Sequence, residues 1–387
     1  MSYNSLNFLN IDQLFSKEEL SIRDSVRSFV NNEVLGLTQA HNRNETFPKE
    51  LIKKFAKLGL LGTNIKGYGC PGLGDVCYGL AMQEIERVDS GLRSFCSVQG
   101  SLVMYPIWAF GDEDQKNKYL PKLASGDYIG CFGLTEPDAG SNPGSMQTKA
   151  INVDGGYKLT GNKMWITNGC ISDIAIIWAK LDNVVRGFIV ETNSPGFSTT
   201  TMKGKLSLRM SVTSELHLQD CFIPESQILP KVQGLKGPLS CLTQARFGIT
   251  WGVLGAANAC YDTALNYSKT RIIFDKPLAG YQLAQAKLVK MVQEITKAQF
   301  LSLQLGRLKE AGELTPAQVS LVKMNNCKMA LEIAREARDM LGANGVIDEY
   351  PIITHMLNLE SVNTYEGTED IHRLVIGMNV TGHSAIK

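Results

Sequence analysis

The sequence predicts an α+β protein of several domains, in the order helical, β, helical. Two changes in the hydrophobic period indicate this order. Apolar residues follow a helical period to about residue 125, then occur in short β-branched and aromatic runs between turns, and return to a helical period after about residue 237. We therefore expect an N-terminal helical domain at 1–127, a middle β domain at 128–236 and a C-terminal helical bundle at 237–387.

The N-terminal region carries the signals of at least two helices. Ser16–Glu19 has the form of a capping box, and Ile22, Val26 and Phe29 follow at the spacing of one apolar helix face. Pro48 opens a second predicted helix, because proline is favoured in the first helical turn. A helical start to the chain follows from these signals.

The middle region is typical of strands separated by turns. Ile174–Trp178 and Gly187–Val190 are apolar runs of strand length, and Asp154–Gly156 is one of the turn clusters between such runs. No helical stripe of about ten residues interrupts them, so an antiparallel, barrel-like sheet is favoured over alternating β and α units. No Gly-x-Gly-x-x-Gly follows a strand, so a Rossmann site has no support.

Long helices are predicted again from about Gly237. Leu288, Met291 and Val292 have helical spacing within a segment at 281–311, and Thr315–Gln318 has the N-cap, proline and capping partner of the next helix. Long helices with short connections predict an antiparallel four-helix bundle.

Composition excludes several classes of function. The 39 basic and 38 acidic residues leave a net charge of +1, which argues against a nucleic-acid binder. The nine cysteines are scattered and form no Cys-x-x-Cys. We therefore expect reduced thiols, with neither a disulfide framework nor a metal site.

The sequence also gives no sign of membrane insertion or export. The longest uncharged apolar run, Phe247–Tyr261, is shorter than the roughly 20 residues of a membrane span. The first ten residues lack the basic region of a signal peptide and the arginines of a transit peptide. We expect a cytoplasmic protein, or one of the mitochondrial matrix if the source is eukaryotic.

The segment Thr364–Thr368 places a carboxylate, Glu366, between the ring of Tyr365 and Gly367. A carboxylate enclosed by apolar groups has a raised pKa and becomes a better base toward a carbon-bound proton. The same segment would also suit an ordinary helix N-terminus with Thr and Glu as capping residues, which would leave Glu366 on the surface. Both interpretations stay open on this segment alone.

Three further runs accompany this segment: Glu86–Ser94, Phe132–Ser141 and Met164–Asn168. In this order and at these separations, the runs resemble those of the acyl-CoA dehydrogenase family, and Glu86–Ser94 resembles its glutaryl-CoA dehydrogenase branch. The resemblance extends over roughly residues 15–382. It implies the acyl-CoA dehydrogenase fold, FAD as cofactor, an acyl-CoA substrate, a homotetramer, and electron-transfer flavoprotein as the electron acceptor.

The resemblance also assigns a role to Glu366. In that family the carboxylate at this position removes a proton α to a thioester. Its backbone N–H and a ribityl hydroxyl of the flavin hold the thioester oxygen while negative charge develops there.

The residues that the resemblance assigns to FAD supply hydroxyls, an apolar wall and a turn with free N–H groups. They are Phe132, Leu134, Thr135, Gly140, Ser141, Trp165, Ile166, Thr167, Arg271, Phe274, Gln282, Asp339, Met340, Leu341, Gly342, Ala343, Thr368, Glu369 and Asp370. Trp165 would equally suit a sheet core, and the run from Asp339 a glycine-terminated helix.

The run from Arg271 to Gln282 is expected to reach the FAD of a neighbouring subunit. Asp275 stands there where the family has glycine; aspartate tolerates a positive φ better than most residues but would repel a pyrophosphate. Asn142 follows Ser141 where the family often has aspartate.

We expect the choice between acyl groups that end in an alkyl tail and acyl groups that end in a carboxylate to depend on Arg93. An alkyl tail does not need a cation, whereas the distal carboxylate of a dicarboxylic monothioester does, and arginine can hold it with two hydrogen bonds. The alternative is a surface ion pair with Glu86 or Asp89. The resemblance places Ser94, Glu86, Tyr365 and Gly367 near the acyl group, and Ser141 and the stretch from Leu239 to Arg246 near CoA. Glu86 is typical of branch members that decarboxylate.

The resemblance therefore implies oxidative decarboxylation of glutaryl-CoA to crotonyl-CoA and CO2. Two alternatives remain. One is a short-chain acyl-CoA dehydrogenase or oxidase that does not decarboxylate. The other is a catalytically silent flavoprotein that binds a partner, although Glu366 and the near-zero net charge disfavour it.

Overall fold

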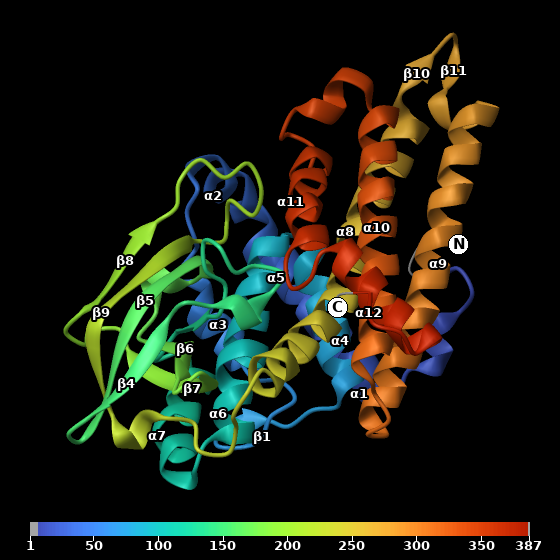
Figure 1. Ribbon diagram of the computed structural model, residues 1–387. Coiled ribbons are helices and arrows are strands. Elements are labelled where there is room, and N and C mark those ends of the chain that lie inside the picture. The colour runs from blue at the N-terminus through green and yellow to red at the C-terminus, as the bar shows by residue number, and fades with distance from the viewer. Residues whose placement is uncertain (1–6, 386–387) are drawn as a thin grey trace.

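The computed structural model describes residues 7–385, and Figure 1 shows their arrangement in three parts. A curled β-sheet lies on one side, a bundle of long helices lies on the other, and helices from the N-terminal part lie between them. The predicted order helical, β, helical is confirmed.

The N-terminal part consists of short helices. They are α1 (Lys17–Phe29), α2 (Thr38–Asn44), α3 (Leu51–Lys57), α4 (Asp75–Glu86), α5 (Ser90–Ser97), α6 (Tyr105–Phe110) and α7 (Glu113–Ala124), with a small hairpin of β1 (Lys66–Gly67) and β2 (Cys70–Pro71). Helices α1, α3, α4 and α5 contribute to one apolar core, whereas α6 and α7 pack in a second core that includes residues of the sheet. The capping box of α1 is present: Ser16 Oγ accepts from the Glu19 N–H at 3.2 Å, and the Ser16 N–H donates to Glu19 Oε2 at 2.7 Å. The helix predicted from Pro48 begins at Leu51.

The middle part is one seven-stranded sheet within the described residues. Its strands are β3 (Gly130–Gly133), β4 (Lys149–Val153), β5 (Gly156–Thr167), β6 (Ile174–Leu181), β7 (Val184–Glu191), β8 (Phe197–Thr201) and β9 (Thr213–Pro224). Most neighbours are antiparallel, as predicted, but β3 and β4 both pair parallel with β6. The prediction of a purely antiparallel sheet is therefore corrected. Residues 174–179 of β6 are all buried, which is the pattern of a strand covered on both faces. Such a strand lacks the alternation of apolar and polar residues, so its sequence does not indicate how it pairs with its neighbours.

The C-terminal part is the predicted helical bundle. It contains α8 (Lys236–Thr270), α9 (Gln282–Glu310), α10 (Pro316–Met340), α11 (Ile352–Thr364) and α12 (Glu369–Thr381). The hairpin of β10 (Ile272–Ile273) and β11 (Lys276–Pro277) projects from one end of the bundle (Figure 1). Thr315 caps α10 through the predicted bond with the Gln318 N–H, at 3.3 Å.

Helix α8 approaches α4 very closely at two glycines. A Cβ atom on Gly255 would lie 1.9 Å from the carbonyl oxygen of Gln83, and one on Gly252 would lie 2.1 Å from Glu86 Oε2. Only glycine avoids both contacts. The close approach brings the Glu86 side chain directly against the α8 backbone.

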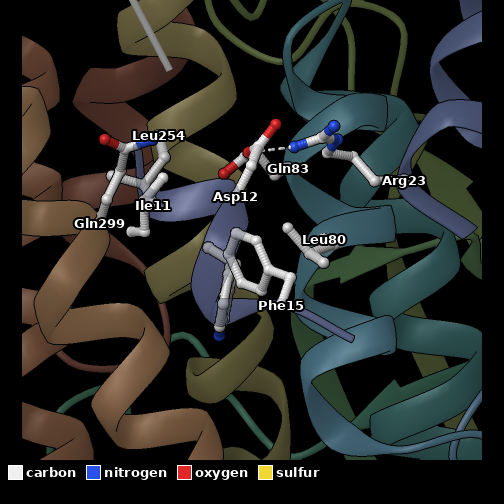
Figure 2. Close-up of a pocket in the computed structure, with 9 residues that line it drawn as sticks. Ile11, Asp12, Phe15, Arg23, Leu80, Gln83, Leu254 and Gln299 are labelled. Carbon is white, nitrogen blue, oxygen red and sulfur yellow. Dashed lines mark hydrogen bonds and ion pairs between the residues drawn. The ribbon is translucent and has the colours of Figure 1, made fainter. Parts of the chain in front are cut away.

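A small cavity lies where the N-terminal segment covers the N-terminal helices and the bundle (Figure 2). Figure 2 shows Phe15 beside Leu80 of α4, and Asp12 paired with Arg23, whose Nη1 lies 2.6 Å from Asp12 Oδ1. The cavity of about 10 Å³ holds about one water molecule, so it is too small for an acyl chain. Across residues 7–385, no helix combines the length and the apolar character of a membrane span.

Candidate active site

Glu366 lies in the short turn between α11 and α12. Its φ is 54°, and that of Gly367 is 104°. Two successive positive φ values are unfavourable for most residues, so surrounding contacts must hold the turn. A Cβ atom at Gly367 would lie 2.8 Å from the ring of the buried His372, which accounts for the glycine. Thr368 caps α12 by accepting from the Ile371 N–H at 3.3 Å, so the predicted helix N-terminus is also present.

Two cations from the bundle hold the carbonyl groups of this turn. Arg246 Nε of α8 donates to the carbonyl oxygen of Glu366 at 2.5 Å. Lys323 Nζ of α10 donates to the carbonyl oxygens of Asn363, Tyr365 and Gly367 at 3.3, 3.1 and 2.8 Å. The turn is thus fixed from both sides by donors that carry positive charge.

The Glu366 side chain is not the surface group of the alternative interpretation. Its Oε2 atom is buried and has no hydrogen-bond partner within residues 7–385. Burial raises the pKa of Glu366, and the nearby cations Arg93, Arg246 and Lys323 only partly oppose this. A buried carboxylate with an unused oxygen and a raised pKa can accept a proton from a bound molecule.

Glu366→Gln should raise the melting temperature near neutral pH. Because the folded chain binds the Glu366 proton more tightly than the unfolded chain, this group stabilises the fold fully below its ordinary pKa of 4.5, and the contribution is lost as pH rises through the raised pKa. The variant has no such loss. Thermal unfolding of both proteins between about pH 4 and pH 8 measures the difference in melting temperature, which should increase with pH. A difference in melting temperature that stays constant over this pH range would contradict the prediction.

Arg93 of α5 joins the turn to the N-terminal helices. Its Nε donates to Glu86 Oε2 at 2.5 Å, and its Nη2 donates to the Tyr365 hydroxyl. Ser94 Oγ lies 3.1 Å from the same hydroxyl, and Ser90 Oγ donates to Glu86 Oε1 at 2.9 Å. The pairing with Glu86 outweighs burial and holds the pKa of Arg93 above its usual range.

The Arg93–Glu86 pair is fully buried, so the surface ion pair considered from the sequence is wrong. The two residues also belong to different helices, since α4 ends at Glu86 and α5 begins at Ser90. Arg93 Nη1 is buried and has no hydrogen-bond partner among the described residues. An unpaired buried donor of this kind is destabilising unless a ligand occupies it.

The two runs that the sequence assigns to the flavin lie side by side. The Met164 N–H donates to the carbonyl oxygen of Thr135 at 2.9 Å, and Lys163 Nζ donates to that of Leu134 at 3.1 Å. Trp165 is 58% exposed and has a φ of 62°, so it is not a sheet core residue. Its exposed indole ring offers a face for a flat aromatic cofactor. Phe132, Leu134 and Ile166 are buried, whereas Thr167 is half-buried.

Several other predicted residues take no part in holding Glu366 within residues 7–385 and lie at or near the surface. Gly140 and Ser141 are exposed in the loop after β3, and Leu239 is exposed on α8. Glu369 and Asp370, in the first turn of α12, both form ion pairs with Arg373.

The remaining predicted cofactor residues lie at the far end of the bundle, where the β10–β11 hairpin projects (Figure 1). Arg271, Phe274 and Gln282 are exposed, and Asp275 has a φ of 70°, so aspartate occupies the positive φ that the sequence suggested. The run of Asp339, Met340, Leu341, Gly342 and Ala343 ends α10 beside this hairpin. Within one chain, the structure does not bring these residues to Trp165.

Sequence reasoning missed two buried lysines near the site. Lys323 lies on the apolar face of α10, four residues after the buried Val319. Lys163 of β5 forms a buried ion pair with Glu136, in which Nζ lies 2.8 Å from Oε1. A lysine on an apolar stripe is rare, and that position was the available signal.

Comparison with known proteins fits this geometry. Three family models match the chain: acyl-CoA dehydrogenase N-terminal domain at 16–127, middle domain at 131–221 and C-terminal domain at 232–381. The crystal structure of a glutaryl-CoA dehydrogenase from Mycobacterium smegmatis in complex with FADH2 is 49% identical, with a TM-score of 0.98 and full coverage of both chains.

Curated relatives are more varied. An acyl-CoA dehydrogenase of Bacillus subtilis is 35% identical, with 95% of this chain and 99% of the relative covered. The mitochondrial isovaleryl-CoA dehydrogenase of Solanum tuberosum is 32% identical, with 94% and 90% covered.

The fold and the matched domains define a FAD-dependent oxidoreductase. More narrowly, the chain belongs to the acyl-CoA dehydrogenase family. FAD is therefore its cofactor, and the exposed indole of Trp165, in a run whose Met164 N–H donates to the Thr135 carbonyl oxygen, fits a flavin ring.

Proposed function

We propose that the protein oxidises glutaryl-CoA and decarboxylates the product to crotonyl-CoA and CO2, with Glu366 as the base. The observation that carries the choice of glutaryl-CoA is the buried Nη1 of Arg93, which has no partner within residues 7–385. A carboxylate entering this apolar site must lose its water, and a charged donor offsets that loss. The similarity to a glutaryl-CoA dehydrogenase over the full chain supports the same substrate.

In the proposed reaction, Glu366 takes a proton from the carbon α to the thioester. Its carboxylate is buried and unpaired on Oε2, so it can approach that proton without first breaking a hydrogen bond. The electron pair of the broken C–H bond moves toward the thioester oxygen, where the Glu366 N–H stabilises the negative charge. Bound FAD supplies the acceptor for the hydride that leaves the β-carbon. Trp165, Thr135 and Thr167 would hold its ring.

Loss of CO2 from the unsaturated product leaves an electron pair, which spreads to the thioester oxygen. The carbanion then takes the proton held by Glu366, which gives crotonyl-CoA and returns Glu366 to the carboxylate. Glu86 supports this second step because it keeps Arg93 in place through the 2.5 Å bond from Nε while Nη1 remains free for the substrate carboxylate. We propose electron-transfer flavoprotein as the acceptor of the electrons.

A short-chain acyl-CoA dehydrogenase without decarboxylation is the second candidate. One observation favours it: Glu86 already balances the charge of Arg93, so the pair is neutral before substrate binds. Among the relatives, a short-chain-specific acyl-CoA dehydrogenase of Megasphaera elsdenii is 34% identical over 86% of this chain.

The test mixes the FAD-loaded protein with glutaryl-CoA, butyryl-CoA and isovaleryl-CoA under anaerobic conditions. We expect glutaryl-CoA to bleach the flavin fastest and to yield crotonyl-CoA and CO2, identified by mass spectrometry. Faster bleaching by butyryl-CoA, with no CO2 from glutaryl-CoA, would favour the second candidate.

We also propose a homotetramer. The exposed apolar side chains of Ile272 and Phe274 on the hairpin, the latter 88% exposed, support burial against another subunit. Native mass spectrometry of the same FAD-loaded sample measures the assembly, and a monomer that retains FAD would contradict this proposal.

A further inference from the structure

Lys323 is a fully buried lysine that bonds to no carboxylate among the described residues. Within residues 7–385, its three hydrogen bonds are all to main-chain carbonyl groups, those of Asn363, Tyr365 and Gly367. An ammonium group has three N–H donors, so this arrangement uses its whole capacity on one turn. Burial lowers the pKa of Lys323, because a cation is less stable away from water.

We propose that Lys323 is a positioning residue for the reaction: it fixes the peptide between Tyr365 and Glu366 so that the Glu366 N–H faces the thioester oxygen of the acyl-CoA. This inference rests on the proposed function, because it explains how the Glu366 N–H, the donor to the thioester oxygen in the proposed reaction, is oriented.

The geometry of a trans peptide explains how Lys323, which binds the Tyr365 carbonyl oxygen, also orients the Glu366 N–H. The chain contains no cis peptide bond within the described residues. In a trans peptide the C=O and the N–H lie in one plane and point in opposite directions. Lys323 Nζ holds the Tyr365 carbonyl oxygen at 3.1 Å, so the Glu366 N–H is directed away from α10. Within residues 7–385, that N–H has no hydrogen-bond partner.

The neighbouring peptides are held in the same way. Arg246 Nε binds the carbonyl oxygen of Glu366 at 2.5 Å, and Lys323 also binds that of Gly367 at 2.8 Å. With φ positive at both Glu366 and Gly367, the turn would relax if these donors were removed. An oxyanion donor is effective only when it is fixed before the charge develops. Lys323 therefore prepares the donor without touching the substrate.

The test separates proton removal from oxidation. In (methylthio)acetyl-CoA a sulfur atom replaces the β-carbon, so no hydride can leave, but the α-hydrogens can still exchange with D2O when an enolate forms and is reprotonated. Exchange catalysed by the FAD-loaded protein is followed by mass spectrometry. We expect Lys323→Met to slow this exchange by roughly tenfold to 100-fold, somewhat less than deletion of an oxyanion donor. Affinity for the analogue, measured from the change in flavin absorbance, should be nearly unchanged.

Lys309→Met is the matched control. Lys309 is a largely buried lysine of the bundle, paired with Asp75 at 2.5 Å, and no hydrogen bond or ion pair within residues 7–385 joins it to the turn. This variant should lose stability and keep the wild-type exchange rate. If Lys323→Met does not fold, Lys323→Gln serves instead, since its shorter amide keeps N–H donors without the charge; we expect exchange at least about fivefold slower, normalised to bound FAD.

The outcomes distinguish this inference from the proposed function. Exchange at the wild-type rate in the folded Lys323 variant, while Glu366→Gln abolishes exchange, would overturn the inference and leave the function intact. Equal slowing in Lys309→Met would also overturn it, because a general loss of stability would then be the cause. A wild-type protein that neither exchanges the analogue nor is reduced by any acyl-CoA would overturn the function, and this inference with it.

Discussion

Glu366→Gln should retain FAD and lose flavin reduction by acyl-CoA, by about 100-fold to about 10,000-fold. The amide has nearly the shape of the carboxylate but cannot accept the α-proton. The main chain of the turn is held independently of the Glu366 side chain, because Arg246 binds the carbonyl oxygen of Glu366 and Lys323 binds the neighbouring carbonyl oxygens. The main chain of the turn should therefore stay in place when the side chain changes. Stopped-flow absorbance of the flavin under anaerobic conditions measures the rate.

Glu360→Gln is the control for this variant. Glu360 lies on α11, six residues before Glu366, and pairs with Arg335 at the surface. Its substitution should leave the rate unchanged. If Glu366→Gln reduces the flavin as fast as Glu360→Gln, the base lies elsewhere in the chain.

Arg93→Gln should decide between dicarboxylic and alkyl substrates. Loss of one member of a buried, hydrogen-bonded charge pair costs roughly 2 to 5 kcal/mol. At about tenfold per 1.36 kcal/mol, kcat/KM for glutaryl-CoA should fall by roughly 30-fold to several-thousand-fold. Butyryl-CoA has no distal carboxylate, so loss of the contact between Arg93 and the substrate should not by itself affect its turnover.

The buried Glu86 requires a second variant in this experiment. Arg93→Gln alone leaves Glu86 buried without its partner, which would damage the site for every substrate. The double variant Arg93→Gln/Glu86→Gln keeps the site neutral, and Ser90 can still bond to residue 86. We expect the double variant to recover butyryl-CoA turnover but not glutaryl-CoA turnover. An equal fall for both substrates in the double variant would exclude Arg93 as the specificity residue.

Local sequence signals predicted the helices well because caps are local. The helix expected at 281–311 spans Gln282–Glu310, and the capping motifs at Ser16 and Thr315 both begin helices. Strand direction was predicted less well. β3 and β6 are neighbours in the sheet, but β4 and β5 lie between them along the chain, so no local pattern indicates that the two pair in parallel. The domain boundaries after residues 127 and 236 stay predictions.

The candidate site was predicted in part. The sequence pointed to Glu366, Arg93 and Trp165, but not to how they are held. Arg93 was expected at the surface or in the acyl pocket, and its burial with Glu86 depends on contacts between two helices that spacing alone does not reveal. Lys323 was missed because its role depends on a turn 40 residues further along the chain. The roles of all these residues in catalysis stay predictions until the variants are measured.

The glycines of α8 restrict how this enzyme can diverge from its relatives. A side chain at position 252 would collide with Glu86 Oε2, and one at position 255 with the main chain of α4. A single substitution at position 252 would therefore alter the helix crossing and release Arg93 in the same step. The Arg93–Glu86 pair and the spacing between α4 and α8 therefore cannot change independently of each other.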